Sequence, residues 1–259
     1  MIALAKARTE RAAGILLDQQ QGTLRRELEQ IQQEASEGKT ESARARTHAL
    51  LDRARLGLRL TEPFRVALAG RPNVGKSSLV NAWLGYERSI VFDQPGTTRD
   101  VVAATASVDG WLIELSDTAG LRETRDPLEA AGARLTERRL ESVDLVVLIL
   151  DAAEPPTPED QALLAAWPDA LRVANKCDLP AADASRISGS IPVSALTGEG
   201  MDALLRAVSL RLVPEPPSPG AAVPFTVGQA EDLCELLDAL DGGNVALADQ
   251  LLTRMTRGN

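Results

Sequence analysis

A glycine-rich segment, Gly70-Arg-Pro-Asn-Val-Gly-Lys-Ser77, has the residue types and spacing of a phosphate-binding loop. An apolar run precedes it and a helical pattern follows it, so backbone N–H groups and the positive end of a helix would face the phosphates. Lys76 is expected to reach the β- and γ-phosphates, and the Ser77 hydroxyl to ligate Mg²⁺. The alternative is a glycine-rich strand-to-helix turn without a ligand.

A second motif, Asn175-Lys-Cys-Asp178, follows the apolar run 171–174 and indicates which base is bound. A carboxylate such as that of Asp178 accepts both the N1–H and the 2-amino donors of guanine. Adenine lacks this pair of donors and would leave the carboxylate unmatched. Ser194-Ala195-Leu196 follows the next expected strand, and the Ala195 N–H is expected to donate to the guanine 6-oxo group. These two motifs, in register with the phosphate loop, predict a guanine nucleotide.

Two further segments have residues suited to Mg²⁺ and the γ-phosphate. Asp117-Thr-Ala-Gly120 ends an expected strand, where an Asp holds Mg²⁺ through water and a Gly N–H contacts the γ-phosphate. In Pro95-Gly-Thr-Thr-Arg-Asp100, one threonine is expected to complete the Mg²⁺ shell. A plain strand-ending turn and a plain polar loop are the alternatives. Leu121 stands where many GTPases have a glutamine that orients water, so hydrolysis must use another group.

The elements that position these motifs are read from the period of the apolar residues. Six strands are expected at 64–69, 101–108, 111–115, 145–150, 171–174 and 191–193. Helices are expected at about 77–85, 127–142, 158–166 and 200–212. This alternation, with one hairpin at Asp109-Gly110, predicts an α/β fold: a mostly parallel six-stranded sheet with helices on both faces.

The flanks of this region read as helix. A helix is expected over 3–36 and another over 41–60, forming either a hairpin that packs its own apolar stripe or a dimerisation element. Two short helices are expected at 230–240 and 245–255, packed on the N-terminal ones because neither is stable alone. The predicted domains are therefore one helical domain in two parts, 1–62 and 223–259, an inserted α/β domain, 63–213, and a proline-rich linker, 214–222.

Composition limits the location and the partners. The 259 residues carry a net charge of −9, which argues against nonspecific nucleic-acid binding by the bulk surface, so DNA is not expected. No apolar run is long enough to cross a bilayer, and no secretory signal is visible. Cys177 and Cys234 are too few for a disulfide framework or a zinc site. The expectation is a cytoplasmic protein without a membrane partner, with Cys234 in a helical core.

Together these motifs resemble the TrmE–Era–EngA group of translation-associated GTPases, most of all the MnmE (TrmE) tRNA-modification GTPases. The residues that carry the resemblance are 70–78, 95–100 and Asp117-Thr-Ala-Gly-Leu-Arg-Glu123. It implies a Ras-like P-loop G domain over about 63–213. It also implies a GTPase switch, Mg²⁺-dependent and K⁺-stimulated, with G domains that dimerise.

The resemblance also implies a role for particular residues. K⁺ would be held by Asn73, Thr97 and the backbone carbonyls of Phe92 and Gln94, and Thr98 would be the Mg²⁺ threonine. Glu129 would position the attacking water; the alternative is a solvated acid at a helix start. The expected catalytic residues are Asn73, Lys76, Thr98 and Glu129. The expected nucleotide contacts are Asn73, Val74, Gly75, Lys76, Ser77, Ser78, Phe92, Asp93, Gln94, Pro95, Gly96, Thr97, Thr98, Asp117, Thr118, Ala119, Gly120, Asn175, Lys176, Cys177, Asp178, Ser194, Ala195 and Leu196.

Two features depart from the MnmE pattern. MnmE proteins begin with a folate-binding domain and end in a tail with a functional cysteine, whereas this sequence starts in helix and ends Arg257-Gly-Asn259. The GTPase chemistry is therefore expected to transfer, with a tRNA-modification or ribosomal partner possible. The alternatives are a ribosome-assembly GTPase like Era or EngA, although no KH signature occurs, and a nucleotide-dependent scaffold with negligible turnover.

Overall fold

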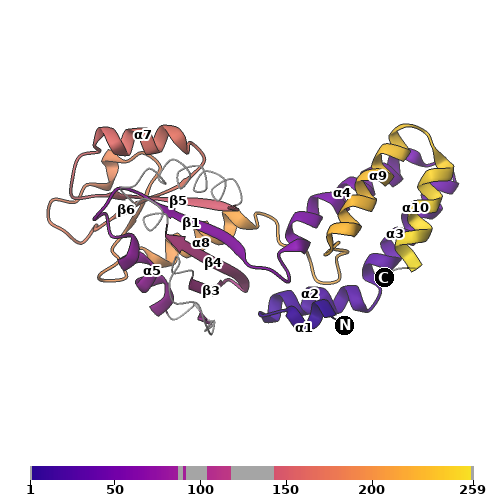
Figure 1. Ribbon diagram of the computed structural model, residues 1–259, viewed down its shortest axis with the longest axis horizontal. Coiled ribbons are helices and arrows are strands. Elements are labelled where there is room, and N and C mark those ends of the chain that lie inside the picture. Colours follow the sequence, from indigo (N-terminus) through magenta and orange to yellow (C-terminus); the bar gives the residue numbers. More distant parts are fainter. Residues whose placement is uncertain (1, 87–89, 92–103, 118–142, 258–259) are drawn as a thin grey trace, which may run out of the picture. The chain divides into compact units, whose positions relative to one another are not determined.

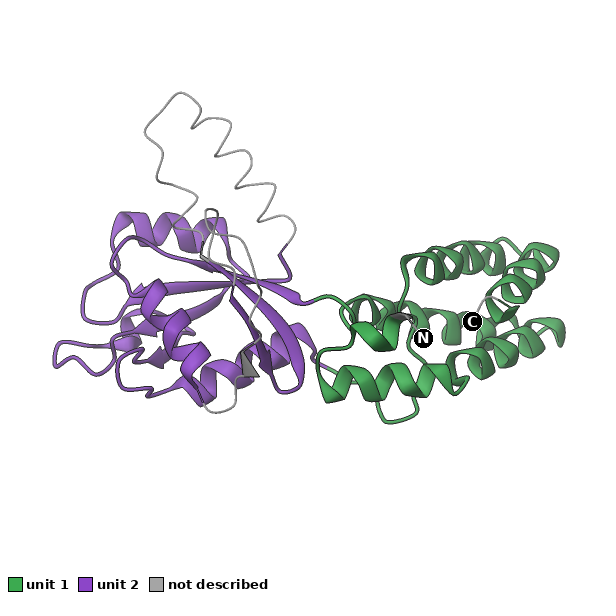
Figure 2. Ribbon diagram, turned by 60° about the horizontal axis from the view of Figure 1, so that its bottom comes forward, with its two compact units in different colours: residues 1–62, 215–259 green, residues 63–214 purple. Residues whose placement is uncertain are grey.

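The protein consists of two compact units, coloured separately in Figure 2. The computed structural model describes residues 2–86, 90–91, 104–117 and 143–257. We call residues 63–214 the sheet unit, and residues 1–62 with 215–259 the helical unit. Within the described residues, no helix has the length and apolar character needed to span a membrane.

The sheet unit is built on a sheet with strand order β2-β3-β4-β1-β5-β6-β7 (Figure 1). The strands are β1 (Phe64–Ala69), β2 (Ile90–Val91), β3 (Ala104–Val108), β4 (Trp111–Asp117), β5 (Leu145–Asp151), β6 (Leu171–Asn175) and β7 (Ile191–Val193). β1 pairs in parallel with β4 and β5, and β5, β6 and β7 continue in parallel. The carboxyl ends of these five strands therefore lie at one edge, where ligands of open α/β sheets bind.

The antiparallel part of the sheet is the hairpin β3–β4. Its turn residues, Asp109 and Gly110, both have positive φ angles, 50° and 78°, as a two-residue type I′ turn requires. The six strands expected from the sequence are present, and β2 pairs with β3 as a seventh. Two residues are too few to show an alternating pattern, so β2 could not be predicted from the sequence.

Three described helices accompany the sheet: α5 (Lys76–Gly85), α7 (Pro158–Ala166) and α8 (Met201–Leu212). In Figure 1, α7 lies above the sheet and α5 and α8 lie below it, so both faces are covered, as expected. α7 starts at Thr157 with a capping box, and Pro158 takes the first helical position. The helix expected at 127–142 lies outside the described residues.

The helical unit joins the two ends of the chain in one core. Its helices are α1 (Ile2–Lys6), α2 (Glu10–Gln20), α3 (Thr23–Ser36), α4 (Thr40–Leu58), α9 (Val227–Asp241) and α10 (Val245–Arg257). α3, α4, α9 and α10 bury their apolar stripes against one another, with Leu28, Leu50, Leu236 and Leu252 fully buried. Burial of each such leucine is worth about 1.5–3 kcal/mol, which neither terminal segment could obtain alone.

The segment that follows the sheet unit is fixed to α2 and α4. The Gln19 side chain donates to the Ala221 carbonyl at 3.0 Å and accepts from the Val223 N–H at 3.1 Å. Gly57 lets α4 approach this segment, because a Cβ at that position would lie 1.7 Å from the Pro224 carbonyl oxygen. The proline-rich stretch therefore runs into an ordered part of the helical unit.

Two expectations for the helical unit were wrong. The region 3–36 is three helices rather than one, because Thr9 caps α2 by accepting the Ala12 N–H, and Gly22 takes a left-handed conformation before α3. Cys234 is exposed rather than part of the core. Its neighbours Leu233 and Leu236 occupy the buried face of α9, and position 234 falls beside that face.

Candidate functional site

The segment between β1 and α5 is held in a conformation that suits glycine. Gly75 has φ +94°, and a Cβ there would lie 2.3 Å from the Asn175 Nδ2 atom. A Cβ at Gly70 would lie 2.4 Å from the Ile149 carbonyl oxygen. Asn73, between them, also has a positive φ, 66°. The loop is therefore shaped by the close contacts at Gly70 and Gly75 and by the left-handed backbone of Asn73. A loop bent in this way can point its backbone N–H groups at an anion.

Lys76 is held at the first turn of α5 by the loop that precedes it. Its ammonium donates to the carbonyls of Gly70 at 2.9 Å and Arg71 at 2.8 Å, and the residue is only 6% exposed. Ser77 and Ser78 follow on the same turn and are exposed. Together, the cradle left by the two glycines, the fixed ammonium and the Ser77 hydroxyl fit a phosphate chain with Mg²⁺.

Asn175 joins the phosphate loop to the loops at the ends of β6 and β7. It ends β6 and is 1% exposed. Its Nδ2 donates to the Val74 carbonyl at 2.8 Å, and its Oδ1 accepts the Ala195 N–H at 3.1 Å. One buried amide therefore ties together three of the motifs predicted from the sequence.

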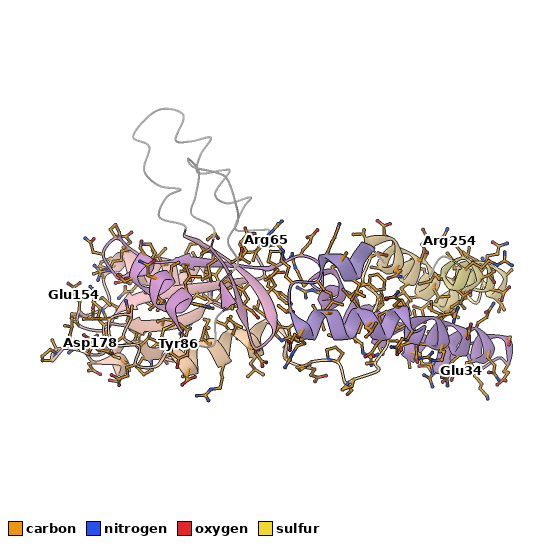
Figure 3. The ribbon with its side chains drawn as sticks, turned by 90° about the horizontal axis from the view of Figure 1, so that it is seen from below. Glu34, Arg65, Tyr86, Glu154, Asp178 and Arg254 are labelled. Atoms are coloured by element: carbon orange, nitrogen blue, oxygen red, sulfur yellow. The ribbon has the colours of Figure 1, made fainter. Side chains whose placement is uncertain are left out.

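The residues predicted to recognise the base lie next to this junction. The Cys177 N–H donates to the Val193 carbonyl at 3.1 Å, which places the loop after β6 against the end of β7. Asp178 is exposed, and Leu196 is 86% exposed although it is a large apolar residue. Figure 3 labels Asp178 and Glu154, which lie at the same end of the sheet unit in that view, away from Arg65 at the start of β1. An exposed leucine and a carboxylate near Ala195 could cover and bind a flat base.

Lys176 takes a left-handed conformation, φ 66°, and forms an ion pair. Its Nζ lies 2.5 Å from the Asp151 Oδ2, and the other carboxylate oxygen accepts the Ala153 N–H at 2.9 Å. Asp151 ends β5 and is 7% exposed. The carboxylate is thus fully engaged and fixes the position of the lysine.

Arg71, the second residue of the phosphate loop, is anchored on the start of α7. Its Nε donates to both oxygens of Asp160 at 2.9 and 3.1 Å, and its Nη2 donates to Glu154 at 2.8 Å. Asp160 is 1% exposed and also accepts the Thr157 backbone N–H and hydroxyl. The hydrogen bond to Glu154 and the charge of Asp160 raise the pKa of the Arg71 guanidinium further above its usual value, against the opposing effect of burial.

The remaining predicted residues are placed only in part. Asp117 ends β4 and pairs with Leu68 of β1, so its backbone lies at the same sheet edge as the phosphate loop. The other predicted residues lie outside the described residues: Phe92, Asp93, Gln94, Pro95, Gly96, Thr97, Thr98, Thr118, Ala119, Gly120 and Glu129.

Comparison with known proteins gives the family. Residues 65–176 match a family described as "50S ribosome-binding GTPase". The tRNA modification GTPase MnmE of Synechococcus sp. (strain JA-3-3Ab) is 38% identical over 223 residues, which cover 84% of this chain and 49% of that protein. MnmE of Nitrosococcus oceani is 47% identical over 158 residues, 58% of this chain and 34% of that protein. This chain carries a GTPase domain that is similar to the GTPase domain of the MnmE proteins.

The matching family and the similar MnmE proteins are all described as GTPases. A guanine nucleotide is therefore the ligand expected of this domain, and the enzyme class given by these names is that of hydrolases acting on GTP. The chain spans about half, or less, of the length of the MnmE relatives. Among solved structures, Era of Aquifex aeolicus bound to GDP and AlF₄⁻ is 29% identical, covering 58% of this chain and 57% of that one, with a TM-score of 0.45.

Sequence reasoning missed the acidic partners of the GTPase domain. The sequence motifs contain none of Asp151, Glu154 and Asp160. The available signal was the position of Asp151, a carboxylate that directly follows a buried parallel strand, where functional side chains gather. The partners of Glu154 and Asp160 could not be inferred, because Arg71 lies more than eighty residues earlier in the chain.

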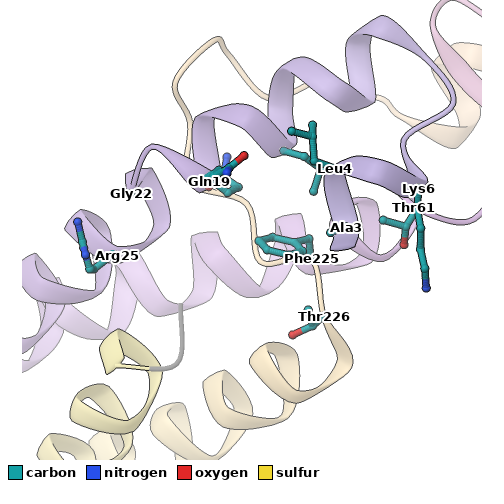
Figure 4. A pocket seen from close by; sticks show the side chains of 11 residues that line it. Ala3, Leu4, Lys6, Gln19, Gly22, Arg25, Thr61, Phe225 and Thr226 are labelled. Atoms are coloured by element: carbon teal, nitrogen blue, oxygen red, sulfur yellow. The ribbon is translucent and has the colours of Figure 1, made fainter. Parts of the chain in front are cut away.

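A hollow in the helical unit is lined by residues of that unit. It encloses about 680 Å³ and is lined by Leu4, Leu16, Gln19, Phe225 and neighbouring residues (Figure 4). The Gln19 amide is already used by the backbone of 221–223. None of the residues predicted from the sequence to bind nucleotide or metal lines it.

Proposed function

We propose that this chain hydrolyses GTP to GDP and phosphate in a Mg²⁺-dependent, K⁺-stimulated reaction and acts as a molecular switch similar to MnmE in tRNA modification. The observation that carries the proposal is a pair of hydrogen bonds at Asn175, which donates to the Val74 carbonyl at 2.8 Å and accepts from the Ala195 N–H at 3.1 Å. They unite a phosphate loop with a base-recognition loop, so one molecule with both a guanine and a phosphate chain fits the site.

In this proposal the chain's own residues bind and orient the nucleotide. Asp178 accepts from the guanine N1–H and 2-amino groups, the Ala195 N–H donates to the 6-oxo group, and Leu196 covers the ring. Lys76, already held by two carbonyls, stabilises the negative charge that develops on the phosphates, usually the largest single catalytic effect. The resemblance to MnmE assigns to Glu129 the positioning of the attacking water, a role for which the Leu121 side chain has no hydrogen-bonding group.

Two cations would complete the charge balance. Mg²⁺, held by Ser77, Thr98 and, through water, Asp117, would neutralise the β- and γ-phosphates. K⁺, held by Asn73, Thr97 and the carbonyls of Phe92 and Gln94, would supply positive charge beside the phosphates. The sequence motifs identify no arginine for this role. We further propose that two GTPase domains associate when K⁺ is bound, and that the partner is a component of tRNA modification.

A ribosomal partner is the second candidate, because the matching family is described as ribosome-binding. Co-sedimentation with purified ribosomal subunits, in GTP and in GDP, separates the two. Nucleotide-dependent binding to the subunits would favour the ribosomal role. A scaffold with negligible turnover would be indicated by tight GTP binding without phosphate release in a single turnover.

The potassium proposal is tested by measuring phosphate release from GTP in KCl and in NaCl at equal ionic strength. We expect a rate about tenfold or more higher in KCl, since a cage sized for K⁺ holds the smaller Na⁺ poorly. Asn73→Ala should abolish the difference with little loss of GTP affinity. Light scattering with GDP and aluminium fluoride should show dimers in KCl only.

A matched asparagine in the helical unit serves as control. Asn244 caps α10 by accepting the Leu247 N–H at 3.1 Å, so Asn244→Ala should retain the full response to K⁺. Equal rates in the two salts would refute the cation mechanism and leave a generic GTPase. Absence of phosphate release in both salts would refute the hydrolase.

A further inference from the structure

Residues 151–160, which we call the β5–α7 segment, run between the two halves of the nucleotide site. The segment starts at the last residue of β5 and ends in the first turn of α7. None of its residues is predicted to touch the nucleotide. Three of its acidic side chains nevertheless pair with residues of the two motifs that do: Asp151 on the base side, and Glu154 and Asp160 on the phosphate side.

On the base side, the contact is made by Asp151. The ion pair with Lys176, at 2.5 Å, fixes a residue whose backbone is in the left-handed region, which is unfavourable for a side chain of this kind. The next residue, Ala152, donates its N–H to the Asn175 carbonyl at 2.8 Å. The segment thus holds the two residues that precede Cys177 and Asp178 through a side chain and through the backbone.

On the phosphate side, Asp160 and Glu154 hold Arg71. The three hydrogen bonds, between 2.8 and 3.1 Å, use the planar fork of the guanidinium, which a lysine could not reproduce. The carbonyl of the same Arg71 accepts a hydrogen bond from Lys76 at 2.8 Å. The position of the Lys76 ammonium is therefore linked, through one residue, to the start of α7.

We propose that the β5–α7 segment is a positioning element that joins the base half and the phosphate half of the nucleotide site, with Asp151 placing Lys176 and with Asp160 and Glu154 placing Arg71. The inference rests on the proposed function in that the ligand is a guanine nucleotide. Removing the partner of a fully buried charge is strongly destabilising, but the Lys176 and Arg71 side chains are 33% and 19% exposed, so loss of a carboxylate charge displaces a cation that solvent still reaches. The effect should therefore appear in nucleotide binding and turnover.

The test uses the full chain and two isosteric variants. Asp151→Asn keeps an acceptor for the Ala153 N–H and removes the charge that holds Lys176, so release of a fluorescent GDP should become about tenfold faster. The kcat for GTP should change much less. Asp160→Asn keeps an acceptor for Thr157 and loosens Arg71, so kcat should fall about tenfold because Lys76 is displaced.

Controls separate positioning from general destabilisation. Asp183→Asn changes another acid of the same unit, whose carboxylate contacts its near neighbours Ser185 and Arg186, and this variant should behave as the unmodified chain. If Asp160→Asn unfolds α7, the variants Arg71→Lys and Glu154→Gln are measured instead, since both leave the Thr157–Asp160 capping box intact. Each should lower kcat with a melting temperature close to that of the unmodified chain.

The proposal is overturned if GDP release and kcat stay within about twofold of the unmodified chain in every variant. It is also overturned if every variant releases GDP faster and loses both kcat and melting temperature to the same degree, because that pattern describes a general loss of structure. A chain that binds GDP but never hydrolyses GTP would refute the hydrolase, whereas the release rates of Asp151→Asn would still decide whether Asp151 positions Lys176.

Discussion

The sheet unit and the helical unit use the backbone in different ways. Among the described residues, the non-glycine residues with positive φ are Asn73, Asp109 and Lys176, all in the sheet unit. Asn73 and Lys176 belong to the motifs predicted to bind nucleotide. In the described part of the helical unit, positive φ angles occur at glycines only, such as Gly22 and Gly38. Unfavourable backbone conformations persist where the surrounding structure holds them, and they cluster at functional sites. The described residues of the helical unit have no non-glycine residue in such a left-handed conformation.

Their polar groups differ in the same way. In the sheet unit, Asp151, Asp160 and Asn175 are buried charged or amide groups that link one loop to another. In the helical unit, cohesion comes mainly from leucines at helical spacing; the buried Gln19 amide ties α2 to residues 221–223, and ion pairs such as Arg254–Asp232 lie at the surface. Surface pairs are worth about 0–1 kcal/mol, so the leucines determine the stability of that unit. Substitutions of one residue type, placed in both units, can test this difference.

The largest difference is expected for aspartate to asparagine. Asp178→Asn should lower GTP affinity about a thousandfold, because the carboxamide cannot accept both guanine donors. It should also admit xanthosine nucleotides, since the new N–H group can donate to the 2-oxo group. Asp249→Asn in α10 alters a carboxylate that bonds to Gln32 at 2.7 Å and should leave nucleotide affinity unchanged. Competition binding measures both, and ATP competing as well as GTP in the unmodified chain would contradict the guanine assignment.

Glycine to alanine should have opposite signs in the two units. Gly75→Ala combines φ +94° with a Cβ only 2.3 Å from the Asn175 Nδ2, so GDP affinity should fall about a hundredfold. Gly14 lies in the middle of α2, where an added Cβ would meet nothing within 4 Å, and Gly14→Ala should stabilise the helical unit by about 0.5–1 kcal/mol. Equilibrium GDP binding and urea unfolding provide the two measurements. An unchanged GDP affinity in Gly75→Ala would show that the close approach to Asn175 is relaxed at no cost.

The same contrast explains what the sequence could predict. Strand and helix periods placed the six longer strands of the sheet, because these signals are local. The glycine-rich and Asn-Lys-x-Asp motifs predict a nucleotide site, and the structure brings the loops that carry them together at Asn175. The break at Gly22 was missed, since a left-handed glycine between two helical patterns leaves their apolar period nearly unchanged. The exposure of Cys234 was missed because a single apolar residue does not define which face of a helix is buried.

The acidic network of the site could not be predicted for a different reason. Arg71 and Asp160 are 89 positions apart, and their meeting depends on β1 and β5 being neighbours in the sheet. A sequence gives the residue types but not which strands pair. Long-range ion pairs of this kind can be predicted only once the strand order is known. The residues of a motif can be recognised without it, because they lie at fixed spacings within a short stretch of sequence.

The smallest effect is expected for the two cysteines, one in each unit. Cys177 is partly buried, and burial, followed by the nearby charges of Glu199 and Asp178, raises the pKa of its thiol. A raised pKa lowers the thiolate fraction at any pH below it, and the thiolate is the form that an alkylating reagent modifies. Cys234 is exposed on α9, so at a pH of about 7.5 it should react several-fold faster with iodoacetamide than Cys177 does.

The rate at Cys177 should rise as the pH increases toward its raised pKa, and bound GDP should slow it further, because the nucleotide would cover the loop after β6. Mass spectrometry of the two peptides, in the intact chain and in Cys234→Ser, follows each site separately. Equal rates at both cysteines, with no protection by GDP, would mean that the thiol of Cys177 is as accessible as that of Cys234. The loop after β6 would then be more open than the hydrogen bonds of Cys177 with Val193 and of Asn175 with Ala195 indicate.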